Sequence, residues 1–202
     1  MKKEFSFYEF VGILIPGSVL LFGVNFVVLR GTKNQLFDIT KIGETVAFLI
    51  LSYAMGHLIQ SFANIFEKII WIIYGGMPTQ WLTKKNRFKQ NLFTEPLNKK
   101  IVEKIEIKYG TGIKDSGRLV YNLIFLQGKS SRIDIFSGNY SLYRGLSIAF
   151  LVLSILCAYQ YNLNWRQTIL SLIPFCLTTY RMIRFAKYYA TETYRTFFNI
   201  QT

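Results

Sequence analysis

The sequence predicts an all-α integral membrane protein with four transmembrane helices in two hairpins and a small helical cytoplasmic domain between the hairpins. Two observations lead to this prediction. The first is the composition, because 51% of the 202 residues are hydrophobic although the formal net charge is +13. The second is that charged and apolar residues are segregated along the chain, which leaves long runs without charge.

Three charge-free runs are long enough to span a bilayer. They comprise residues 10–29, 45–66 and 145–165, and each is about 20 residues long, the length that crosses a hydrocarbon core of about 30 Å. The first run is long for the apolar part of a signal peptide, and no small-residue cleavage site follows it, so we expect a retained helix.

The fourth run, 167–180, is only about 14 residues long and is short for a spanning helix. It can span if Arg166 and Arg181 extend to opposite head-group regions, with Trp165 and Tyr180 as interfacial anchors. The sequence therefore predicts four segments, a first transmembrane hairpin, a basic helical cytoplasmic segment, a second transmembrane hairpin and a cytoplasmic helical tail: 5–74, 75–143, 144–187 and 188–202.

The distribution of basic residues predicts the orientation. All but four of the 24 Lys and Arg residues lie in the N-terminus, in residues 68–144 around the central segment, or in residues 181–202 at the C-terminal end. The exceptions are Arg30, Lys33, Lys41 and Arg166. Because basic residues are concentrated on the cytoplasmic side of membrane proteins, both termini and the central segment are predicted to be cytoplasmic.

The central segment has helix signals of its own. Pro96 stands at the start of a helix that ends near Gly110, and its apolar residues Leu97, Ile101, Ile105 and Tyr109 recur every four positions. Residues 116–128 form a second short apolar helix bounded by glycines. The aromatic-rich tail can continue the fourth helix, and we expect it to pack on the central segment or on a partner.

The second run contains polar residues on one helical face, which we call the polar stripe: Tyr53, His57, Gln60, Ser61 and Asn64. Polar groups in hydrocarbon need partners on neighbouring helices or in water. The stripe therefore indicates either hydrogen bonds that hold helices together or the wet lining of an oligomeric pore. A metal site is disfavoured because His57 is the only histidine.

The first run contains Gly12, Pro16 and Gly17 in the sequence GILIPGS. Proline removes a backbone hydrogen bond and kinks a helix, and glycine allows a second helix to approach closely. The interpretations are a packing kink or a gating hinge. Cys157 and Cys176 show no metal or redox spacing and are read as small apolar residues.

The sequence contains no nucleophile elbow, phosphate-binding loop or paired-histidine motif. We therefore expect neither an enzyme nor a cofactor. Its central segment carries a basic patch, which indicates attraction to anionic lipid head groups or contact with RNA or a nucleoprotein. The basic patch consists of Lys84, Lys85, Arg87, Lys89, Lys99 and Lys100.

Four segments together resemble small bacterial membrane proteins of phage defence: YEFVGILIPGSVLLF, YAMGHLIQSFANIFEK, FSGNYSLYRGLSIAF and RFAKYYATETYRTFF. They are most similar to the four-span accessory membrane protein of type VI-B CRISPR loci. The resemblance implies a multi-pass protein of the bacterial inner membrane. It also implies a partner, a defence nuclease or its ribonucleoprotein, which the protein regulates or serves as membrane effector.

Two other classes of function stay open at this point. An autonomous oligomeric pore of the abortive-infection type would use the polar stripe as its lining, and its partner would be further copies of the chain. A small transporter or scaffold subunit is the third alternative, although the sequence shows no inverted-repeat halves.

Overall fold

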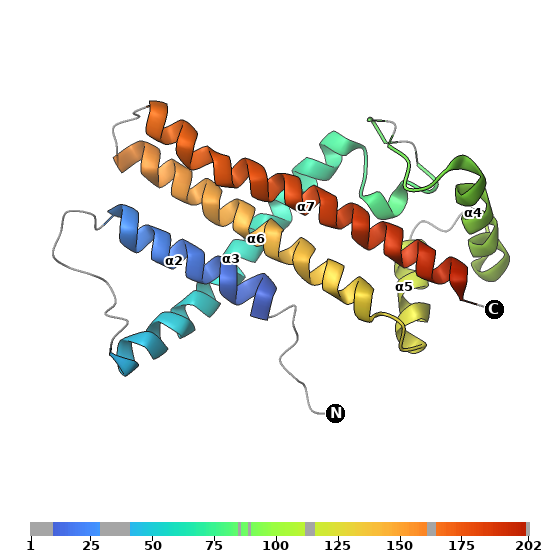
Figure 1. Cartoon of the computed structure of the whole chain (residues 1–202), viewed down its shortest axis with the longest axis horizontal. Helices are drawn as coiled ribbons and strands as arrows, with labels where there is room; N and C mark the ends of the chain where they lie inside the picture. The colour runs from blue at the N-terminus through green and yellow to red at the C-terminus, as the bar shows by residue number, and fades with distance from the viewer. Residues whose placement is uncertain are drawn as a thin grey trace. The chain divides into compact units, whose positions relative to one another are not determined.

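The computed structural model describes residues 10–28, 41–84, 86–88, 90–111, 116–160 and 165–200. Within these ranges every regular element is a helix (Figure 1), which confirms the all-α prediction. The elements are η1 (Phe10–Leu14), α2 (Ile15–Val28), α3 (Ile42–Tyr74), η2 (Pro78–Gln80), α4 (Glu95–Tyr109), α5 (Ser116–Leu126), α6 (Ser131–Gln160) and α7 (Trp165–Asn199).

Four helical segments are long and apolar enough to cross a membrane, namely Phe10–Val27, Ile42–Tyr74, Ser131–Gln160 and Thr168–Asn199. Each predicted run overlaps one of them, and three of the helices extend well beyond their runs. The reason is that a charge ends an apolar run without ending a helix. The fourth helix, α7, continues to Asn199 because no proline or glycine interrupts the sequence after Pro174.

The chain forms two compact units, which we call the first unit and the second unit. The first comprises 1–67 and 138–182, and the second comprises 68–137 and 183–202. Because α3, α6 and α7 are continuous, each contributes residues to both units. The unit boundaries therefore fall inside helices, whereas the predicted segments were bounded by changes in charge.

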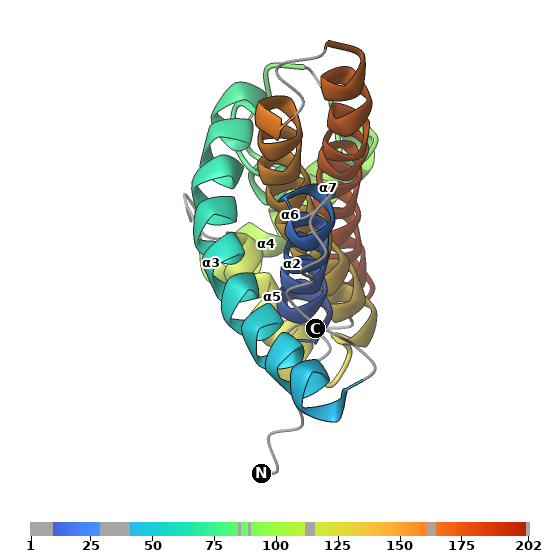
Figure 2. The same cartoon turned by 90° about the vertical axis from the view of Figure 1, so that its left-hand side faces the viewer.

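Helices in the first unit approach one another through small residues. α2 lies beside α6 (Figures 1 and 2), and an added Cβ at Gly12 would lie 2.6 Å from Ser141 Oγ. A Cβ at Gly17 would lie 1.8 Å from the Ser52 carbonyl oxygen on α3. Ser154 of α6 donates a 2.7 Å hydrogen bond to the Ser171 carbonyl of α7. These contacts bring the helix backbones close together, which is possible only where side chains are absent or short.

The second unit has a core of large apolar side chains from α4, α5, α6 and α7 and from residues before α4 and after α7. Its buried members are Leu82, Phe93, Ile101, Ile105, Val120, Ile124, Ile133, Tyr194, Phe197 and Ile200. Three of these come from the end of the chain, so the aromatic tail packs on the central segment as predicted. Burial of this kind stabilises a fold by about 25 cal/mol per Å² of apolar surface.

The helix signals of the central segment are confirmed. α4 begins at Glu95 with Pro96 in its first turn, and Gly110 ends it with a φ of 92°. Of the four apolar residues that recur every four positions in α4, Ile101 and Ile105 are buried, and Leu97 and Tyr109 pack against the core. Tyr121 of α5 donates a 2.7 Å hydrogen bond to Asp134. Burial, aided by this carboxylate, raises the pKa of the phenol, which keeps it a donor.

Candidate functional site

Gln60 of α3 is the centre of a buried polar cluster in the first unit. Its amide nitrogen donates to the Gly12 carbonyl and, at 3.3 Å, to the carbonyl and hydroxyl oxygens of Ser141. The Gly12 carbonyl needs an external donor because Pro16, four residues later, has no N–H. Gln60 thus supplies the hydrogen bond that the proline removes and ties α3 to η1 and α6.

The amide oxygen of Gln60 accepts two hydrogen bonds from Arg144 of α6. The donors are Nε at 3.2 Å and Nη2 at 2.7 Å. The third guanidinium nitrogen, Nη1, donates to the Glu67 carboxylate. Only 12% of the Arg144 side chain and 15% of the Glu67 side chain are exposed. In this largely buried position the charges of Arg144 and Glu67 compensate each other. Loss of one of them would leave the other charge without a partner away from water.

Glycines make room for the buried polar cluster. An added Cβ at Gly145 would lie 2.7 Å from Pro16 Cγ and 3.0 Å from the Gln60 amide nitrogen. Pro16 itself is fully buried. The predicted kink residues Gly12, Pro16 and Gly17 therefore all lie at helix contacts, and a five-residue π-helix, Phe10–Leu14, precedes the proline. π-helical turns are frequent at functional sites.

The structure divides the polar stripe. Gln60 is 8% exposed and Tyr53 is half-buried, whereas His57, Ser61 and Asn64 are exposed. The packed face of α3 is centred on Gly56, Ile59 and Ala63, so it reaches only the Gln60 edge of the stripe. The His57 ring contacts Tyr53 edge to face, with ring centroids 4.7 Å apart.

The sequence interpretation missed the charged part of the buried polar cluster. Glu67 and Arg144 each stand directly outside a charge-free run, and the predicted polar stripe did not include them. Their positions carried a usable signal, since Glu67 lies two helical turns after Gln60 and therefore shares its face. Among the described residues, no group of three or more His, Cys, Asp or Glu could hold a metal ion.

The basic patch lies in the second unit, where its described members Lys84, Arg87, Lys99 and Lys100 are exposed. Lys85 and Lys89 lie outside the described residues. Near Arg87, the Phe88 ring packs on Tyr74 with ring centroids 4.8 Å apart.

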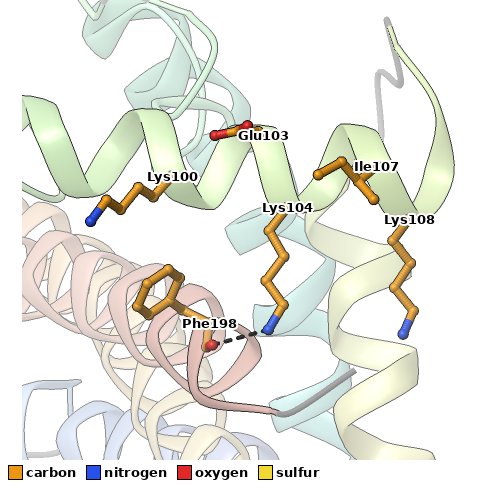
Figure 3. Close-up of a pocket in the computed structure, with 6 residues that line it drawn as sticks. All are labelled: Lys100, Glu103, Lys104, Ile107, Lys108 and Phe198. Carbon is orange, nitrogen blue, oxygen red and sulfur yellow. Dashed lines mark hydrogen bonds between the residues drawn. The ribbon is translucent and has the colours of Figure 1, made fainter.

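A basic groove begins at Lys100 and continues along α4 (Figure 3). It has a volume of about 480 Å³ and is lined by Lys100, Glu103, Lys104, Ile107, Lys108 and Phe198. In Figure 3 the three lysines point to the side on which Phe198 lies, and Glu103 lies on the other side of the helix. Successive lysines are four residues apart, which is slightly more than one helical turn and about 6 Å along the helix axis.

Lys104 differs from the lysines on either side of it. Its amino group donates to the Phe198 carbonyl at 3.1 Å and to the Ile200 carbonyl. It also lies 5.4 Å from the centroid of the Phe197 ring. Lys104 therefore stabilises the C-terminal end of α7, where free carbonyls accumulate. Lys100 and Lys108 are exposed and available to an anionic ligand.

The comparisons with known proteins add no assignment. No protein-family model, no curated protein and no solved structure matches the chain.

Proposed function

We propose that the chain is a multi-pass protein of the bacterial cell membrane, with four spanning helices in two hairpins. The observation that carries this proposal is the reversed polarity of the first unit. Its buried residues include the hydroxylated side chains of Ser52, Ser141, Ser147, Ser154 and Thr178. Its exposed residues include the large apolar side chains of Phe22, Phe26, Leu58, Phe62, Ile155, Leu170 and Leu177. Small and hydroxylated residues inside and large apolar residues outside are typical of helices in lipid.

The second unit is proposed to lie in the cytoplasm, together with both termini. Of the 24 Lys and Arg residues of the chain, 16 belong to it and eight belong to the first unit. Basic residues next to spanning helices remain on the cytoplasmic side, where anionic lipid head groups also attract them.

In this membrane frame we propose a role as an accessory protein of RNA-guided antiviral defence, a regulator of the defence ribonuclease or its membrane effector. The resemblance to the type VI-B accessory protein supports this role. The basic groove supports it too, because Lys100, Lys108 and the Phe198 ring combine positive charge with an aromatic surface, the combination that binds single-stranded nucleic acid. The second unit would thus contact the ribonucleoprotein.

The experiment is an interference assay in cells that carry the nuclease, its guide and this protein. We expect phage survival to change when the gene is deleted and the nuclease to co-purify with the wild-type protein. Lys100→Glu with Lys108→Glu should abolish both effects. A control of equal charge change, Arg118→Glu with Lys129→Glu, alters exposed residues outside the groove and should retain both. Unchanged survival and no co-purification would contradict the role in defence.

A second candidate function is an autonomous oligomeric pore. The observation that favours it is the exposure of His57, Ser61 and Asn64 on a helix of spanning length. Reconstituted protein should then release dye from liposomes, and His57→Leu with Asn64→Leu should stop the release. No release from inserted wild-type protein would reject a pore.

A further inference from the structure

Four exposed residues of α3 follow one another at regular intervals, and three of them belong to the polar stripe. Ala54, His57, Ser61 and Asn64 are separated by steps of three, four and three residues, and all four are exposed. We call this row the α3 seam. Alternating steps of three and four give the 3.5-residue repeat by which two helices wind around each other in a left-handed coiled coil.

The α3 seam lies away from the contacts within the chain. Gly56, Ile59, Gln60 and Ala63 are buried against other helices of the first unit. At 100° per residue their mean direction is about 130° from the α3 seam. The α3 seam is therefore a second packing face, and its residues are small or polar where the neighbouring positions Leu58 and Phe62 are large and apolar.

We infer that the α3 seam is the interface with a second copy of this chain, in which the two α3 helices run parallel. This inference rests on the proposed membrane insertion. Two copies inserted with the same orientation are related by an axis along the membrane normal, which brings equal residues to equal depth. Each α3 seam residue then meets its own counterpart.

The chemistry of the α3 seam fits such identical pairs. An Asn side chain has donors and acceptors and a neutral His has one of each, so each can pair with its counterpart, whereas a Ser hydroxyl has a single proton. The Ser61 hydroxyl donates that proton to the His57 carbonyl at 3.1 Å, so its oxygen can accept a hydrogen bond from a donor on the second copy. Lipid tails offer no hydrogen bonds, whereas a second α3 seam offers them at the same level. Ala54 adds a position at which the helices can approach closely.

Disulfide cross-linking in native membranes tests the inference. The background is the full chain with Cys157→Ala and Cys176→Ala, because these are the two cysteines of the sequence. With a membrane-permeant copper oxidant we expect Ser61→Cys to form a dimer of twice 23.6 kDa. We expect the adjacent variant Phe62→Cys, which faces away from the α3 seam, to give about tenfold less dimer, since a disulfide requires Cβ atoms about 4 Å apart.

A second pair of variants separates a specific interface from random collision. With Ala54→Cys as the reporter, Ser61→Phe should lower the dimer yield about tenfold by overfilling the α3 seam, and Phe62→Trp should leave it unchanged. Equal cross-linking at positions 61 and 62, or none at position 61, would overturn the inference. Washing the membranes with alkaline carbonate distinguishes failure of this inference from failure of the proposed membrane insertion. Release of the protein from the membrane would refute the insertion. Retention of the protein without dimer formation would refute only the α3 seam as an interface.

Discussion

The two units bury different kinds of side chain, although the helices α3, α6 and α7 contribute to both. The closest contacts in the first unit are made by glycine, serine and alanine, such as Gly17 against the Ser52 carbonyl and the fully buried Ala149, and they accompany a small buried cluster that includes Leu20, Ile59 and Ile148. Contacts in the second unit are made by isoleucine and aromatic residues, such as Ile101 and Phe197. The same helices thus change their packing chemistry along their length.

This difference indicates which solvent each unit is built for. In water, burial of large apolar side chains drives helix association, and the second unit follows this rule. In lipid that force is absent, so helices associate through close approach of small residues and through buried hydrogen bonds. The first unit follows the second rule, and the following variants test how far the contrast extends.

The largest effect is expected from Arg144→Met in the first unit. It leaves the Glu67 carboxylate and the Gln60 carbonyl buried without their donors. We expect a loss of about 3–5 kcal/mol in stability, the range for breaking a buried ion pair from one side. Thermal unfolding of the protein in lipid nanodiscs, followed by circular dichroism, measures it.

The matched control is the double variant Arg144→Met with Glu67→Met. Replacing both charges by apolar residues removes the orphaned carboxylate, so most of the stability should return. Equal losses in the single and the double variant would mean that the ion pair itself, rather than an unpaired charge, determines the stability of this site.

The next effect is expected from Gly56→Ala, which tests close helix approach. The new Cβ would lie 2.1 Å from the Ile13 carbonyl oxygen, a backbone atom that cannot rotate away. We expect a loss of about 1–3 kcal/mol from overpacking. Gly43→Ala on the same helix has nothing within 4 Å of the new atom and should change stability by less than about 0.5 kcal/mol. Equal behaviour of the two variants would refute the packing account.

In the second unit, Tyr194→Phe removes the hydrogen bonds of one buried hydroxyl without changing the apolar core. The Tyr194 hydroxyl donates to the Thr79 carbonyl, and the side chain is fully buried. We expect a loss of about 1 kcal/mol in thermal unfolding. Tyr188→Phe alters a hydroxyl on a side chain that is 39% exposed and should have a smaller effect. A larger effect at Tyr188 would show that burial does not decide the result.

The smallest effect is expected from Lys104→Met, which keeps the aliphatic stem. It removes the amino group that binds the Phe198 and Ile200 carbonyls at the end of α7. We expect a loss of about 0.5–1 kcal/mol at low salt, decreasing as salt is added. Lys99→Met, at an exposed position of the same helix, is the control. A loss that does not depend on salt would contradict an electrostatic role.

Local signals in the sequence predicted the second unit well. Pro96 and Gly110 mark the two ends of α4, and the four-residue spacing of Ile101 and Ile105 identifies its buried face. Such signals act within a few residues of the structure they determine, so a single sequence contains them.

The first unit was less predictable for two physical reasons. Charge-free runs measure apolar length, and helices continue past a charge that has a partner, as α6 does at Arg144. The partner itself, Glu67, lies 77 positions away, and no local pattern links the two. A helical wheel places His57 and Gln60 on one side of α3, but only the packing of η1 and α6 decides that Gln60 alone is covered.

The central claim is that the first unit lies in lipid and the second in water. Spin labels test it directly, at Phe62→Cys in the first unit and Ile107→Cys in the second, which replace side chains that are 64% and 80% exposed. Both labels are placed in the cysteine-free chain in liposomes. We predict that the label at position 62 collides mainly with oxygen, which concentrates in lipid, and the label at position 107 mainly with a water-soluble nickel chelate. A label at position 62 that is as accessible to nickel as the label at position 107 would contradict the account.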